Sequence, residues 1–196
     1  GKKYYDIMME NALHKWVDEK KLDMRVLSGL DHPGIIDILQ KKKNFDKIDW
    51  SILSANPVAI KLLEQNQDKI DWKAFSQNTS SWAIQMLEKN QDKINWYYLS
   101  GNPTATKLLK KNQDKIEWRA FSQNSSPWAI QMLKKNQDKI NFSYLSHNTN
   151  PLTMKILQQN PDKIVWLSLS ENPSPWAIEI LQQNLDNIEW EIITNE

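Results

Sequence analysis

The sequence contains no cysteine and only 4 glycines among its 196 residues. Without cysteine the chain can form neither a disulfide framework nor a thiolate metal site, which fits a reducing compartment or indifference to redox conditions. Scarce glycine disfavours the glycine-rich loops that cradle phosphate groups in many enzymes. The G-x-G-x-x-G, G-x-x-x-x-G-K-[ST] and H-E-x-x-H motifs are also absent. The sequence therefore gives no support to a nucleotide-binding or zinc-hydrolase function.

An excess of charge of one sign and long apolar runs are missing too. Lys and Arg total 25 and Asp and Glu total 24, which is less imbalance than proteins held to nucleic acid or membrane by bulk charge usually show. No apolar run approaches the ~18 residues of a membrane span. The first residues lack the apolar core of a secretory signal. We therefore expect an intracellular protein without a membrane partner.

Asparagine, with 19 residues, and tryptophan, with 10, are in excess because of an internal repeat. Seven aspartates recur at steps of 22 or 24 residues. Each has Asn two positions before it, Ile two after and an aromatic residue four after. These aspartates are Asp46, Asp68, Asp92, Asp114, Asp138, Asp162 and Asp186. The repeat reads roughly N-P-x-A-I-x-L-L-x-x-N-x-D-K-I-x-W-x-x-L-S, a periodicity typical of tandem-repeat architectures.

Each repeat predicts two short helices and no strand. The longer helix starts at Asn or Ser, usually followed by Pro, which suits an N-cap and a first helical position. Apolar residues at helical spacing then extend for about 9–10 residues. An asparagine such as Asn66 is expected to close this helix in the left-handed conformation. The shorter helix, of α- or 3₁₀-type, starts after cap residues such as Asp49 and Asp71.

Neither helix can bury its apolar side alone, whereas stacked neighbours can. We therefore predict an all-α solenoid of about seven to eight repeats of 22–24 residues. Residues 1–19 are expected to form an N-terminal capping helix. Residues 20–196 are expected to form the array, degenerate over 20–43 and regular over 44–196.

The recurring residues are interpreted as structural ladders. The Asn and Asp ladders are expected to hydrogen-bond the interhelix loops. The Asn ladder could alternatively form a hydrogen-bonded spine between repeats. The Trp ladder is expected to lie in the core. The lysines that follow the aspartates are expected to pair with them on a solvated face. Metal binding by Asp, phosphate binding by Lys and base or sugar stacking on Trp are the functional alternatives. The ladder residues are Asn66, Asp68, Asn90, Asp92, Asn112, Asp114, Asn136, Asp138, Trp72, Trp96 and Trp118.

The repeat resembles short tandem repeats in proteins of giant DNA viruses that infect amoebae. The resemblance covers residues 44–196 well and 20–43 loosely. The architecture is also similar to leucine-rich-repeat variants, in which α- and 3₁₀-helices alternate every ~24 residues. The resemblance implies a scaffold in the host cytoplasm, the nucleus or the virion, and it carries over no catalytic residue.

Positions that differ between repeats are the candidates for partner binding. The charge pattern adds a hint: residues 101–150 carry 8 basic and 3 acidic side chains, whereas residues 151–196 carry 2 and 7. Lysines at equivalent positions of neighbouring repeats are expected to form a basic ridge within 107–135. The candidates are Lys73, Tyr97, Lys107, Lys110, Lys111, Arg119, Lys134 and Lys135, and two further positions on the shorter helices are Ser143 and Leu167.

These features predict a non-enzymatic scaffold that binds a protein partner of unknown identity. The alternative is a DNA-binding or packaging protein that uses the basic ridge, and self-association between oppositely charged ends also stays open. An enzyme is the third hypothesis, supported only by Asp31, His32 and Asp37 in the irregular segment 29–43. We therefore expect no catalytic residue, no metal and no cofactor.

Overall fold

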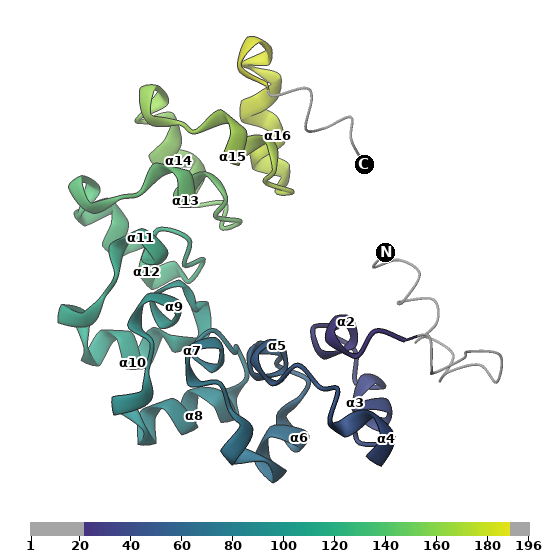
Figure 1. The fold of residues 1–196 in the computed structure, drawn as a ribbon. Helices are drawn as coiled ribbons and strands as arrows, with labels where there is room; N and C mark the ends of the chain where they lie inside the picture. Colours follow the sequence, from purple (N-terminus) through teal and green to yellow (C-terminus); the bar gives the residue numbers. More distant parts are fainter. Residues whose placement is uncertain (1–21, 189–196) are drawn as a thin grey trace. The chain divides into compact units, whose positions relative to one another are not determined.

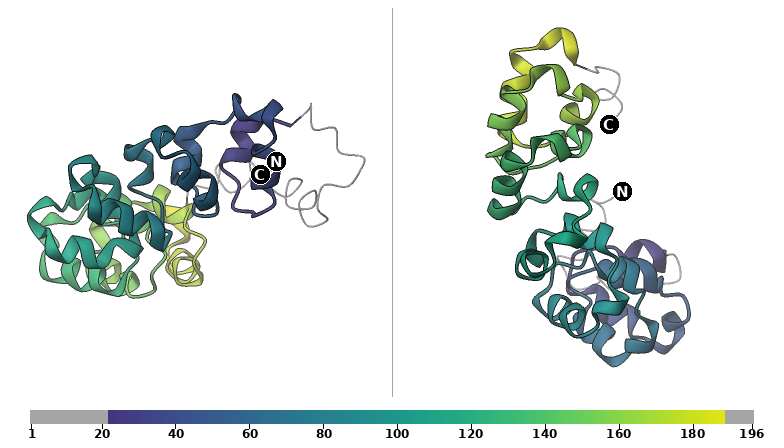
Figure 2. Two further views of the ribbon diagram at one scale, coloured as in Figure 1. Left: turned by 90° about the horizontal axis from the view of Figure 1, so that it is seen from below. Right: turned by 90° about the vertical axis from the view of Figure 1, so that its left-hand side faces the viewer.

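The computed structural model describes residues 22–188, and this part of the chain is all-α (Figure 1). It contains α-helices and 3₁₀-helices and no strand, as the fold class predicted. The two further views show the same short helices joined by turns (Figure 2). None of the helices in this range is long and apolar enough to span a bilayer. The predicted capping helix, 1–19, lies outside the described residues.

The chain divides into two compact parts, residues 1–95 and 96–196. The helices of the first part are α2 (Met24–Ser28), α3 (Ile35–Leu39), α4 (Lys42–Phe45), α5 (Trp50–Ala55), α6 (Ile60–Gln65), η2 (Gln67–Lys69), α7 (Trp72–Phe75), α8 (Ser81–Lys89) and η3 (Gln91–Lys93). Those of the second part are α9 (Trp96–Gly101), η4 (Pro103–Ala105), α10 (Thr106–Lys111), η5 (Gln113–Lys115), α11 (Trp118–Phe121), α12 (Pro127–Lys135), η6 (Gln137–Lys139), α13 (Phe142–Ser146), α14 (Thr153–Gln158), η7 (Pro161–Lys163), α15 (Trp166–Ser170), α16 (Pro175–Gln182) and η8 (Leu185–Asn187).

The shorter helices begin at the aromatic ladder and lie beside one another within each part. Asp49 caps α5 by accepting from the backbone N–H of Ile52 over 3.0 Å, and Asp71 caps α7 in the same way. In the first part α5 packs beside both α2 and α7. In the second part α9 packs beside α11, and α13 beside α15. The caps satisfy backbone donors that so short a helix leaves unpaired.

The longer helices have two lengths. The helices α8, α12 and α16 start directly after a serine and run for 9, 9 and 8 residues. The helix α10 has 6 residues, but η4 runs directly into it, so the helical segment 103–111 has the predicted length of 9 residues. The helices α6 and α14 have 6 residues without such an extension, so the predicted length was wrong for them. The Asn-Pro start explains why the α-helix itself is short in all three. The Asn56 side chain accepts from Val58 N over 3.0 Å, and Ala59 N donates to the Asn56 carbonyl over 3.3 Å, so a tight turn precedes α6.

A one-turn 3₁₀-helix that the sequence did not predict follows the longer helices from α6 onward. Asn66, between α6 and η2, has φ −135° and ψ 52°, so the predicted left-handed conformation was wrong. Asn66 instead ends α6 through its side chain, which donates to the Leu62 carbonyl over 2.8 Å. The same contact to the residue four positions earlier is made by Asn90, Asn112, Asn136, Asn160 and Asn184.

A second asparagine series makes the hydrogen bonds between successive repeats. It belongs to the pattern Ser-x-Asn, which is invariant at the end of the shorter helices from α5 onward. Each buried amide donates to two backbone carbonyls of the preceding repeat over 2.7 to 3.2 Å. The donors and first acceptors are Asn56 to Ser28, Asn78 to Ser54, Asn124 to Ser100, Asn148 to Ser122 and Asn172 to Ser146. The predicted spine between repeats therefore exists in each part, but other asparagines form it.

The serine of the same pattern joins neighbouring repeats as well. Ser54 Oγ donates to the Trp50 carbonyl over 2.7 Å and accepts from Asp71 N over 3.0 Å. Ser122 makes the equivalent pair of bonds to Trp118 and Asn141. These bonds give buried backbone groups the partners that they require.

The deepest core positions hold Leu, Ile, Ala and Phe rather than the tryptophan ladder. In α7 the Phe75 side chain has 0% exposure, whereas Trp72 is only half-buried. The α11 pair, Phe121 and Trp118, shows the same contrast. Burial of such an apolar side chain contributes about 1.5–3 kcal/mol. Trp82 adds an edge-on contact to Phe75, with ring centroids 5.5 Å apart.

Candidate functional site

Residues from three shorter helices of the second part meet in one polar and aromatic cluster. The hydroxyl oxygens of Tyr97 on α9 and Tyr144 on α13 lie 2.6 Å apart. The guanidinium carbon of Arg119 on α11 lies 5.3 Å from the ring centroid of Tyr144, a cation–π contact. Two predicted candidates, Tyr97 and Arg119, are thus brought together through Tyr144, which the sequence analysis did not single out.

The hydrogen bond between the two tyrosines affects the pKa of Tyr97. The hydrogen bond from Tyr144, with burial as a second cause, raises the pKa of the Tyr97 phenol above its ordinary value of 10.0. The Tyr97 phenol therefore keeps its proton near neutral pH. Two hydroxyl groups that share one hydrogen bond leave one proton free to donate.

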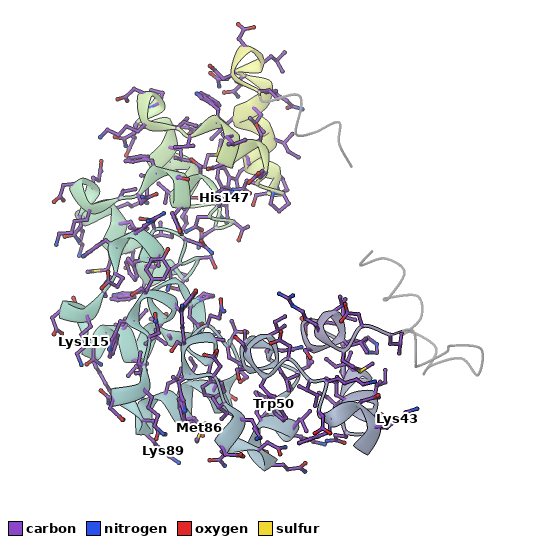
Figure 3. All side chains as sticks on the ribbon, viewed as in Figure 1. Lys43, Trp50, Met86, Lys89, Lys115 and His147 are labelled. Atoms are coloured by element: carbon purple, nitrogen blue, oxygen red, sulfur yellow. The ribbon has the colours of Figure 1, made fainter. Side chains whose placement is uncertain are left out.

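A cavity of about 550 Å³ opens beside this cluster and shares Tyr144 with it. Its walls are Gln123, Ser143, Tyr144 and His147. The Ser143 hydroxyl lies 3.1 Å from the Ser168 hydroxyl on α15. His147, labelled in Figure 3, follows directly after α13. Cavities of this size hold small ligands or individual side chains of a partner.

His147 connects α13 to the end of α15 at the rim of the cavity. Its Nε2 lies 2.8 Å from a carboxylate oxygen of Glu171, and its Nδ1 lies 3.1 Å from the Ser143 carbonyl. Both ring nitrogens therefore face oxygen acceptors. Because His147 and Glu171 occupy the same position in successive repeats, this contact shows that these positions are spatial neighbours.

The sequence analysis missed the variable position inside Ser-x-Asn. Gln123, His147 and Glu171 occupy this position, and all three side chains are exposed. The signal was available, because an unvarying Ser and an unvarying Asn enclose a residue that changes in almost every repeat. Two of these three residues line the cavity.

No protein-family model, curated protein or solved structure matches this chain. Function is therefore argued from the side chains. Within residues 22–188, no three His, Asp or Glu side chains lie close enough together to hold a metal ion.

Four lysines of the ladder, Lys93, Lys115, Lys139 and Lys163, lie over aromatic rings. Lys115 Nζ is 4.7 Å from the Trp96 ring centroid, and Lys139 Nζ is 4.7 Å from that of Trp118. In the first part Lys93 Nζ lies 4.5 Å from the Trp72 ring centroid. Each lysine thus covers the half-buried aromatic residue of the preceding repeat. The predicted pairing with aspartate is found for Lys69, whose Nζ lies 3.7 Å from Asp68.

The aspartate ladder is exposed to solvent. Asp68, Asp92, Asp114 and Asp138 each lie within a 3₁₀-helix, and none of them accepts a hydrogen bond from the described residues. The prediction that they hydrogen-bond the interhelix loop was therefore wrong. The aspartates that bind backbone N–H groups are instead the caps Asp23, Asp49 and Asp71.

The predicted basic residues occupy exposed positions on α10 and α12. Lys107, Lys110 and Lys111 lie on α10, whereas Lys134 and Lys135 end α12. Lys110 reaches α12, because its Nζ lies 5.7 Å from the Trp128 ring centroid. Lys73 is exposed on α7 in the first part.

Among the residues of the enzyme hypothesis, His32 makes a local backbone contact. His32 Nδ1 accepts from the backbone N–H of Gly34 over 3.0 Å, and thus stabilises the turn before α3. Asp31 and Asp37 are exposed. His32 therefore makes a local structural contact.

Proposed function

We propose that the chain is a non-enzymatic tandem-repeat scaffold, stacked as a solenoid, which binds a protein partner through the shorter-helix face of its second part. The observation that carries the proposal is the meeting of Tyr97, Arg119 and Tyr144 beside the cavity. Aromatic residues and arginine dominate the binding energy of protein interfaces. A viral source and an intracellular location remain part of the proposal.

The division between invariant and variable residues supports this function. The buried Asn of Ser-x-Asn binds backbone groups of the neighbouring repeat, and so do the serines Ser54, Ser100 and Ser122. The residues that differ between repeats, such as Arg119 and His147, are exposed. Stacked repeats commonly use such variable positions as an extended binding surface. The same side chains would therefore set the choice of partner and leave the stacking unchanged.

The test is affinity capture with a face variant and a control variant. The face variant combines Tyr97→Ala, Arg119→Ala and His147→Ala. The control combines Gln65→Ala, Lys89→Ala and Gln158→Ala, three exposed residues at the ends of longer helices. We expect the face variant to lose a partner that the wild type and the control retain after nuclease treatment, with a thermal midpoint close to that of the wild type. Retention of all partners by the face variant would overturn the proposal.

A nucleic-acid-associated protein is the second candidate, favoured by the exposed lysines that Lys110 connects across α10 and α12. Phosphate contacts of this kind weaken strongly as salt rises. The charge reversals Lys110→Glu and Lys134→Glu should then abolish binding to duplex DNA at low salt. If these changes leave DNA binding intact, the basic ridge is excluded as the DNA-binding surface.

A further inference from the structure

The cavity of the second part has hydrogen-bond donors in and beside its wall that lack an acceptor among residues 22–188. Arg119 makes no ion pair with any described residue, although Glu117 lies two positions before it. The Tyr97–Tyr144 and Ser143–Ser168 pairs each share one hydrogen bond between two hydroxyl groups. Each pair therefore retains one proton that has no acceptor among residues 22–188.

The carboxylate of Glu171, which contacts the lining residue His147, is already engaged. Glu171 contacts His147 over 2.8 Å on the α15 side, whereas Arg119 approaches Tyr144 from α11. The exposed amide of Gln123 adds two further donors to the wall. Two hydroxyl groups and an amide thus line the cavity, and the guanidinium group of Arg119 lies over the ring of Tyr144, one of the lining residues.

We propose that this cavity binds the carboxylate side chain of an acidic peptide segment, with Arg119 as its ion-pair partner. The inference rests on the proposed function and names the partner class at the same site. A guanidinium group and a carboxylate form two parallel hydrogen bonds, which makes Arg suited to this recognition. The cavity of about 550 Å³ accommodates one or two peptide side chains. The basic balance of residues 101–150, with 8 basic and 3 acidic side chains, favours an acidic segment.

The experiment is an NMR titration of the full chain, which follows the side-chain Nε–Hε resonance of Arg119. The probe is the peptide Gly-Ser-Glu-Glu-Ser-Gly, and its neutral match is Gly-Ser-Gln-Gln-Ser-Gly. We expect the Glu peptide to shift the resonance saturably and to bind at least about tenfold more tightly than the Gln peptide. Equal binding of the two peptides, or no shift, would overturn the inference.

Variants establish whether Arg119 acts through its charge alone. Arg119→Gln should weaken the Glu peptide about tenfold or more, and Arg119→Lys should weaken it less because the charge remains without the planar fork. Lys89→Gln removes the same charge from an exposed site on α8, labelled in Figure 3, and should leave the affinity within about twofold. Equal effects of Arg119→Gln and Lys89→Gln would assign the binding to net charge and refute the site.

Inorganic phosphate is a further probe in the titration, and it distinguishes a carboxylate-binding site from a phosphate-binding site. Phosphate that binds more tightly than the Glu peptide would overturn the carboxylate assignment. The outcome also distinguishes this inference from the proposed function. If the Glu peptide fails to bind while the face variant still loses its partner, the inference is wrong and the scaffold function stands.

Discussion

The side-chain amide of Asn124 donates to the carbonyl oxygen of Ser100, 24 residues earlier, over 2.8 Å. It donates to Asn102 as well, and its oxygen accepts from Ser126 N. Asn124→Ala would leave the Ser100 carbonyl and the Ser126 N–H without partners, whereas the Asn102 carbonyl still accepts from Ala105 N, so we expect a loss of about 2 kcal/mol or more in the free energy of unfolding. Asn112→Ala is the control, because Asn112 is half-buried and donates to a single carbonyl. Urea denaturation measures both, and equal losses would contradict the assignment of the two asparagine series.

Ser122 and Ser146 form a matched pair of buried serines. Ser122 Oγ donates to the Trp118 carbonyl and accepts from Asn141 N, whereas Ser146 Oγ has no hydrogen-bond partner among the described residues. Ser122→Ala should therefore destabilise the chain by about 1–3 kcal/mol. Ser146→Ala should be neutral or stabilising, because it removes an unsatisfied buried hydroxyl. The thermal midpoints of unfolding of the two variants test this prediction. Equal destabilisation by the two changes would contradict it.

The contact of Lys115 with Trp96 predicts which member of the Asp-Lys pair affects stability. Lys115→Met keeps the apolar stem and removes the charge above the ring, so it should cost about 0.5–1 kcal/mol. Asp114→Asn changes an exposed carboxylate and should stay within about 0.5 kcal/mol of the wild type. Denaturation of both variants in the same buffer tests this order, and the reverse order would favour an Asp–Lys ion pair.

Asp71 predicts a specific loss of stability in acid. The backbone N–H of Ala74 is the main cause that holds the pKa of Asp71 below its ordinary value of 3.8, with burial acting in the opposite direction. Because the folded state lowers this pKa, the stabilisation is present above about pH 4 and is lost as the pH falls through the folded pKa. Asp71→Asn retains the cap and should flatten this acid decline. Asp92→Asn, at an exposed residue that accepts no hydrogen bond, should leave the decline unchanged in pH-dependent denaturation.

The helices could be predicted from the sequence because local signals specify them. Apolar spacing, the Ser caps and the aromatic start of the shorter helices all depend on neighbours within about four residues. The 3₁₀-helix after α6 was not predictable in this way, because Gln67–Lys69 resembles an ordinary polar turn. The shortened α6 follows from a turn at Asn56 that is anchored to carbonyls 26 and 28 residues earlier.

The roles of equivalent polar residues were harder to predict than their periodicity. Asn66 and Asn78 recur with the same steps, yet one ends its own helix and the other binds the preceding repeat. Periodicity alone cannot separate a local from a non-local hydrogen bond. The candidate site depended on side chains from α9, α11 and α13 that are up to 47 residues apart. Tyr97 and Arg119 were singled out because they vary, but their meeting with Tyr144 required the fold.

The Ser-x-Asn junction has a direction, because the later repeat supplies the side chain and the earlier repeat supplies only main-chain oxygen. Any residue type offers that oxygen, so the residue between Ser and Asn is free to change without altering the junction. It is Ala55 in one repeat, Gln123 in another and His147 in a third. A duplicated repeat would supply its own asparagine side chain, and the repeat before it would present the same two backbone carbonyls as acceptors. Gene duplication could therefore lengthen such a chain by whole repeats while each new copy acquires its own surface chemistry.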